Sequence, residues 1–76
     1  MRYIANYFWT YDTLDSDVGI AHGQSIKEFK GLTEDPVVAL AEINRVLSME
    51  NSPELRRGYS LISVNQLYEE EVIRVF

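Results

Sequence analysis

One stretch of this sequence predicts an amphipathic helix, and it limits the possible folds more than any other feature. Between residues 36 and 49 the apolar side chains recur at helical spacing and form a single stripe, made of Ala39, Leu40, Ile43, Val46 and Leu47. Asp35 can cap free backbone N–H groups, and Pro36 suits the first helical position because it has no N–H to donate. The segment Asn51-Ser52-Pro53 ends the helix, since proline cannot continue the hydrogen-bond ladder. One helix covers only one face of a sheet, so the other face meets water or a partner.

The segment before the helix predicts two strands. Residues 2–12 are dense in aromatic side chains and include a few β-branched ones, which favours a strand. A second strand is predicted from Val18 to about Phe29, where side chains of different character alternate between two faces. Residues 12–17 carry the side chains that form local turns, so the two strands predict an antiparallel hairpin.

The segment after the helix predicts two more strands. Residues 52–58 indicate one further turn, capped by Ser52 and stopped by Gly58. A third strand is predicted over residues 59–67, and a short final strand over residues 72–76.

The predicted order is therefore β-β-α-β-β, in a single compact domain over residues 1–76. This order predicts an α+β fold, a mainly antiparallel sheet with one helix packed on one face. A β-grasp-like mixed sheet is compatible with the same order.

The alternation of side chains assigns residues to the two faces of the predicted sheet. Seven residues are expected to face the helix: Ile4, Phe8, Val18, Ile20, Ile26, Ile62 and Val64. Four aromatic residues of the first strand then form a row on the open face: Tyr3, Tyr7, Trp9 and Tyr11. Gly19, Ala21 and Gly23 would lie beside this row if the hairpin register permits, and they are small enough for large rings to lie across them. The opposite assignment would bury the aromatic side chains under the helix.

Two interpretations of the aromatic row compete. In the first, the rings are part of the architecture, where they stiffen a thin sheet and add burial that a small domain needs. Alternatively they form a binding or dimer interface, because Tyr and Trp are enriched in the buried centres of interfaces.

The charge balance favours a protein partner over a nucleic acid. Seven Lys and Arg residues against twelve Asp and Glu residues leave a net charge of −5, which disfavours direct DNA or RNA binding. An acidic chain is suited to a basic surface on another protein. Asp12, Asp15 and Asp17 would steer such a partner toward the aromatic row. The default interpretation of these three carboxylates is a solvated turn, because the EF-hand pattern of a calcium site is absent.

Catalytic machinery is mostly missing from the sequence. His22 is the single histidine, cysteine is absent, and no serine lies in a nucleophile motif. We therefore expect no enzyme, no cofactor and no metal. No apolar run is long enough to cross a membrane and the sequence begins without a signal peptide, so we expect no membrane partner and a cytoplasmic location.

The order of these features resembles that of small accessory proteins encoded by bacteriophages and prophages. The residues that carry the resemblance are the aromatic segment Tyr3–Tyr11, the Gly-x-Ala-x-Gly pattern over Gly19–Gly23, and the helix entry at Asp35-Pro36. The resemblance implies a protein that binds a host enzyme or defence complex stoichiometrically in the host cytoplasm, as anti-CRISPR proteins do. It carries over no site residue.

The leading hypothesis is a non-enzymatic protein-binding module, in the form of a phage-type inhibitor or modulator of a host complex. Its partner-binding residues would be Tyr7, Trp9, Tyr11, Asp12, Asp15 and Asp17. One alternative is a homodimer that uses the aromatic face or the edge strand 72–76. The other is an acidic mimic of nucleic acid that acts through its carboxylate clusters.

Overall fold

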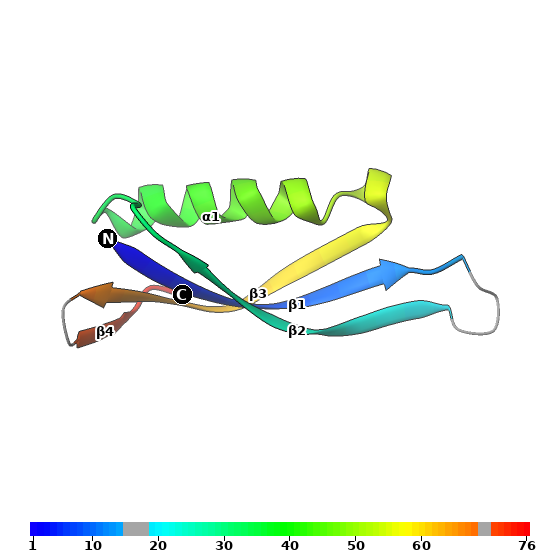
Figure 1. Cartoon of the computed structure of the whole chain (residues 1–76), viewed down its shortest axis with the longest axis horizontal. Coiled ribbons are helices and arrows are strands. Elements are labelled where there is room, and N and C mark those ends of the chain that lie inside the picture. The colour runs from blue at the N-terminus through cyan, green and yellow to red at the C-terminus, as the bar shows by residue number, and fades with distance from the viewer. Residues whose placement is uncertain (15–18, 69–70) are drawn as a thin grey trace.

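The computed structural model describes residues 1–14, 19–68 and 71–76. Its elements follow in this order: β1 (Arg2–Asp12), β2 (Ile20–Phe29), α1 (Pro36–Glu50), the 3-10 turn η1 (Pro53–Leu55), β3 (Arg57–Tyr68) and β4 (Glu71–Arg74). The four strands form one sheet in the order β2-β1-β3-β4, and α1 lies along one face of it (Figure 1). The predicted α+β fold is confirmed. Every strand pair is antiparallel, so the sheet is not the mixed sheet of the alternative.

The predicted hairpin forms, and β1 is an inner strand with a partner on each side. It pairs with β2 from Tyr3 opposite Phe29 to Asp12 opposite Ile20. On its other side it pairs with β3, which begins at Arg57, two residues earlier than expected. The expected start of the second strand, Val18, lies outside the described residues.

The helix signals in the sequence are confirmed. The Asp35 carboxylate accepts a hydrogen bond of 3.0 Å from the Val37 N–H, and Pro36 occupies the first helical position. The helix ends at Glu50, one residue beyond the prediction, and the Asn51 N–H closes it by donating to the Leu47 carbonyl.

The predicted turn after the helix also forms, but it ends differently. Ser52 caps η1 through its side chain, as expected. Arg56, with a left-handed φ of 58°, stops the turn in place of Gly58. Gly58 instead pairs with Thr10 inside the sheet.

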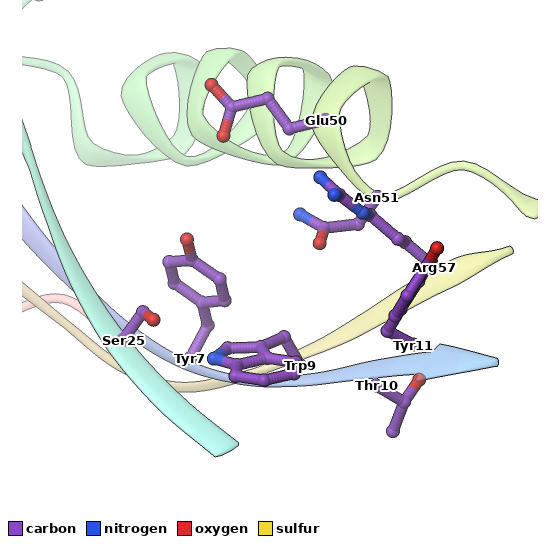
Figure 2. A pocket seen from close by; sticks show the side chains of 8 residues that line it. All are labelled: Tyr7, Trp9, Thr10, Tyr11, Ser25, Glu50, Asn51 and Arg57. Atoms are coloured by element: carbon purple, nitrogen blue, oxygen red, sulfur yellow. The ribbon is translucent and has the colours of Figure 1, made fainter. Parts of the chain in front are cut away.

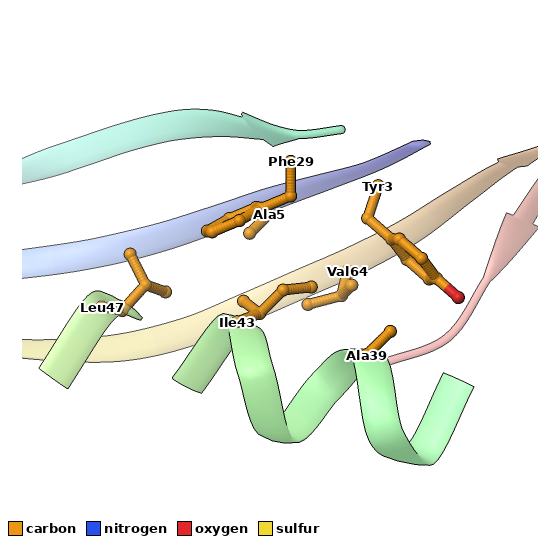
Figure 3. Close-up of a cluster of buried hydrophobic side chains, with 7 residues drawn as sticks. All are labelled: Tyr3, Ala5, Phe29, Ala39, Ile43, Leu47 and Val64. Atoms are coloured by element: carbon orange, nitrogen blue, oxygen red, sulfur yellow. The ribbon is translucent and has the colours of Figure 1, made fainter. Parts of the chain in front are cut away.

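The buried core lies on the opposite face of β1 from the predicted one, which corrects the face assignment. Seven apolar side chains form it, between the sheet and α1 (Figure 3): Tyr3, Ala5, Phe29, Ala39, Ile43, Leu47 and Val64. Of the residues predicted to face the helix, only Val64 belongs to this core. Five others do not: the exposed Ile20, Ile26 and Ile62, and the half-buried Ile4 and Phe8. The seventh, Val18, lies outside the described residues.

The polar end of Tyr3 explains how an aromatic residue can occupy the centre of the core. Its hydroxyl donates to the Thr33 carbonyl at 2.7 Å and accepts from Gln66 Nε2 at 3.0 Å. A buried phenol is stable only when its hydroxyl is hydrogen-bonded, and these two partners satisfy it. Gln66 is itself buried, and its amide also donates to the Glu34 carbonyl.

A β-bulge in β3 explains why simple alternation misplaced Ile62. Asn6 pairs with Ser63 while the next residue, Tyr7, pairs with Leu61, so Ile62 has no residue opposite it. The extra residue reverses the alternation along β3. Val64 faces α1 on one side of the bulge, and Leu61 faces it on the other side.

Tyr3→Phe should lower the free energy of unfolding by about 1–2 kcal/mol at neutral pH, because buried polar groups lose their partner. Burial is the main cause that raises the pKa of Tyr3 in the folded chain; the Gln66 hydrogen bond opposes this rise, and the charges of Asp35 and Glu34 add to it. The unfolded chain therefore loses this proton at a lower pH than the folded chain does.

The stabilisation by Tyr3 should accordingly be complete below about pH 10 and decline above it. Urea denaturation of wild type and Tyr3→Phe at about pH 8 and about pH 11 measures this. The difference in unfolding free energy between wild type and Tyr3→Phe should be smaller at the higher pH. A difference that stays constant would contradict the stabilising role of the buried Tyr3 hydroxyl.

Candidate functional site

The strands β1 and β2 extend beyond the C-terminal end of α1 (Figure 1). A pocket lies beside this end of the helix. Its volume is about 370 Å³. Eight residues line it (Figure 2): Tyr7, Trp9, Thr10, Tyr11, Ser25, Glu50, Asn51 and Arg57. The lining thus combines the hairpin, the end of the helix and the start of β3.

The pocket brings together Tyr7, Trp9 and Tyr11, the three aromatic residues that the sequence singled out. They are alternate residues of β1, so they lie on the same face as Tyr3 and Ala5, under the helix layer and not on the open face as predicted. Because α1 ends at Glu50, Trp9 is only half-buried and Tyr11 is exposed.

The Trp9 ring lies across a glycine, as the sequence predicted. Trp9 pairs with Gly23 of β2, and a Cβ added at Gly23 would lie 2.7 Å from Trp9 Cζ2. In Figure 2 the Trp9 indole lies along the sheet while the Tyr7 ring stands beside it. Gly23 therefore provides the space in which the flat ring forms part of the pocket lining.

Arg57 provides a cation at the rim of the pocket. It is the cross-strand partner of Tyr11, and its guanidinium carbon lies 5.4 Å from the centre of the Tyr11 ring. This is cation–π distance, at which the ring orients the planar guanidinium. Within residues 1–14, 19–68 and 71–76 the Arg57 guanidinium has no hydrogen-bond acceptor or carboxylate partner. Its N–H donors are thus available to a bound group.

The other charged residue of the pocket is already paired. The Glu50 carboxylate forms an ion pair with Lys27 of β2. Asn51 donates its side-chain amide to the Leu47 carbonyl at 2.9 Å. The local charge that a ligand would meet is therefore that of Arg57.

The predicted acidic residues are only partly placed by the structure. Asp12 is exposed at the end of β1, where its carboxylate accepts a hydrogen bond of 3.0 Å from the Leu14 N–H, and it does not line the pocket. Asp15 and Asp17 lie outside the described residues. Across the ranges that the structure describes, no three His, Cys, Asp or Glu residues are grouped so that they could hold a metal ion.

His22 lies away from the pocket. It is exposed on the other face of the sheet, where its ring centre lies 5.7 Å from that of Phe8. No acid–base pair involving His22 occurs in the described part of the chain.

The sequence did not identify Arg57, Glu50 or Asn51 as site residues. Arg57 was expected in the turn after the helix, and only the register of β3 places it opposite Tyr11. Glu50 and Asn51 reach the pocket because α1 ends directly above the hairpin. The sequence did hold a signal for Glu50 and Asn51, because the end of the helix at Asn51 and the aromatic strand could both be recognised.

Comparisons with known proteins give no match, whether with protein-family models, with curated proteins or with solved structures. The resemblance to phage accessory proteins therefore stays a prediction. No helix in the described ranges is long and apolar enough to cross a membrane.

Proposed function

We propose that this chain is a non-enzymatic protein-binding module whose pocket receives a side chain from an exposed segment of a partner protein. One observation carries the proposal: three aromatic side chains line the same pocket as a guanidinium that has no acceptor among the described residues. Aromatic residues and arginine are the types that contribute most binding energy in interfaces. A pocket of about 370 Å³ is large enough to take one large side chain and its neighbour.

The chemistry of the pocket favours an apolar side chain next to a carboxylate. The rings of Tyr7 and Trp9 offer apolar surface, and Arg57 can hold a carboxylate through two parallel N–H bonds. Glu50 does not repel such a group strongly, because Lys27 neutralises it. Exposed charges farther from the pocket than the Debye length of about 8 Å are largely screened. The contacts in the pocket therefore influence the preference more than the net charge of −5 does. The steering of a basic partner by Asp12, Asp15 and Asp17 stays a prediction from the sequence.

The fluorescence of Trp9 tests the proposal directly, because the chain contains one tryptophan. The probes are two blocked dipeptides, N-acetyl-Phe-Glu-amide and N-acetyl-Phe-Gln-amide. We expect both to change the emission of Trp9, with a Kd about tenfold lower for the glutamate peptide, since a charge-assisted hydrogen bond contributes about 1.5 kcal/mol or more.

Arg57→Gln should remove the preference for glutamate, while Arg74→Gln serves as the matched control. The control removes the same charge from β4, at the other end of the sheet. No change in Trp9 emission with either peptide would contradict the proposed pocket. A preference for glutamate that survives Arg57→Gln would contradict the role of Arg57.

A host enzyme or defence complex in the cytoplasm is the target that the phage resemblance favours. Retention of one complex from bacterial lysate by wild type and Arg74→Gln, but not by Arg57→Gln, would identify it. Retention of the same complex by all three proteins would show that the complex does not bind through Arg57 of this pocket.

A further inference from the structure

The face of the sheet that α1 leaves open carries apolar side chains on all four strands. Six of them share this face by their register: Ile4, Phe8, Ile20, Ile26, Leu67 and Val72. Ile26 is 71% exposed and Val72 is 65% exposed. Ile4 and Phe8 are diagonal neighbours of Ile26, and Leu67 pairs with Val72, so part of this face is an apolar patch that a partner can cover.

The middle of this open face has no charged side chain. The central rungs of β1 place Asn6, Phe8 and Thr10 between uncharged partners on both sides: Ile26, Gln24 and His22 on β2, and Ser63, Ser60 and Gly58 on β3. Charged residues lie toward the ends of the face, where Arg2 pairs with Glu28 at 2.9 Å. In a chain with a net charge of −5, this face is where a second copy can approach without bringing like charges together.

The dimensions of the chain also show that it is elongated. Its radius of gyration is 14.2 Å, whereas a compact domain of this length has about 11 Å. Its accessible surface is 5281 Å², against about 4,800 Å² expected for a compact monomer of the same mass. The chain therefore exposes more surface than a compact monomer of its size does.

We propose that two copies of this chain pack their open sheet faces together in a two-fold dimer. The sheet lies in a molecule of 47 × 20 × 16 Å, so its face can supply the area of about 800 Å² per partner that a stable interface buries. Such face-to-face packing of two sheets is a standard arrangement, with the sheets about 10 Å apart. The homodimer alternative from the sequence used the aromatic row or the final strand, whereas the structure places the available apolar face on the other side of the sheet.

The dimer goes beyond the proposed pocket because the two sites lie on opposite faces. The pocket is on the side of α1, and the open face is on the other side. Two pockets would therefore stay accessible on the outer surfaces of the dimer, which permits bivalent binding.

The mass in solution tests the dimer. Sedimentation equilibrium of wild type up to high micromolar concentration should give twice the chain mass of 8.8 kDa. Ile26→Lys places a charge on the open face at β2, and Ser60→Lys places one at β3, so each should raise the dimer Kd at least tenfold. Both side chains are exposed in the single chain, so these variants should fold, which circular dichroism verifies.

Val37→Lys is the matched control. Val37 is 77% exposed on α1, in the other layer, so a lysine there should leave the dimer intact. Arg57→Gln should also remain dimeric. The mass in solution therefore tests the dimer proposal alone, and the peptide titrations of Trp9 emission test the pocket proposal alone.

Three outcomes would overturn the dimer proposal. The first is a monomeric wild type at high micromolar concentration. The second is a dimer that resists both open-face lysines. The third is a dimer that Ile26→Lys weakens and Ser60→Lys does not, because that pattern indicates pairing between two β2 edges and not between two faces.

Discussion

Replacing Ile43 by alanine should lower the free energy of unfolding by about 3 kcal/mol. Ile43 is fully buried in the middle of the inner side of α1, between the turns of Ala39 and Leu47. Its truncation removes apolar atoms from the core and leaves a cavity that the rigid sheet beneath cannot fill. For a domain of this size the melting temperature should fall by about 12–24 °C.

Val37→Ala is the control for this prediction. Val37 is on the same helix and mostly exposed, so its truncation should change the stability by less than about 0.5 kcal/mol. Thermal denaturation followed by circular dichroism compares the variants with wild type, at one protein concentration because self-association would shift the transitions. Equal losses at Ile43 and Val37 would mean that α1 does not pack on the sheet through the side containing Ile43.

Gly23→Val should lower the free energy of unfolding by about 2–3 kcal/mol. A Cβ at this position would lie 2.7 Å from the Trp9 ring, so the indole must leave its place on the sheet. The same movement removes part of the pocket lining. Trp9 emission should therefore shift toward that of solvent-exposed tryptophan, in parallel with the loss of stability.

A double-mutant cycle separates the clash with Trp9 from other effects of the valine. In a Trp9→Leu background the flat ring is gone, so Gly23→Val should cost much less stability there. Gln24→Val is the control on the same strand, measured at a protein concentration at which the chain is monomeric. Gln24 is then exposed on the other face, where a β-branched residue is tolerated. The same loss from Gly23→Val in both backgrounds would show that the strain does not come from Trp9.

The elements of the fold could be predicted from the sequence because their signals are local. The Asp35-Pro36 helix start, the apolar stripe of α1 and the hairpin each depend on residues close together in the chain. The choice of sheet face could not be predicted in this way. Large apolar side chains occupy both faces of β1, with Ile4 and Phe8 on one and Tyr3 and Tyr7 on the other, so alternation alone does not distinguish them.

Contacts between distant segments decide that choice. Tyr3 is held in the core by Thr33 and Gln66, and the bulge at Ile62 reverses the alternation of β3. In the candidate site, too, the local features could be predicted from the sequence and the contacts between distant segments could not. The aromatic residues of β1 were recognised as a group, while the position of Arg57 opposite Tyr11 depends on a register between strands far apart in the chain.

The pairing of β1 with β3 also has a consequence for synthesis on the ribosome. Tyr3 and its hydrogen-bond partner Gln66 are 63 residues apart, so at usual rates of translation roughly 3–13 s separate their emergence. The hairpin of β1 and β2 can form early in that interval, but the helix and β3 that complete its core come later. The nascent hairpin thus carries Tyr7 and Trp9 for seconds before α1 and β3 are available to pack against it.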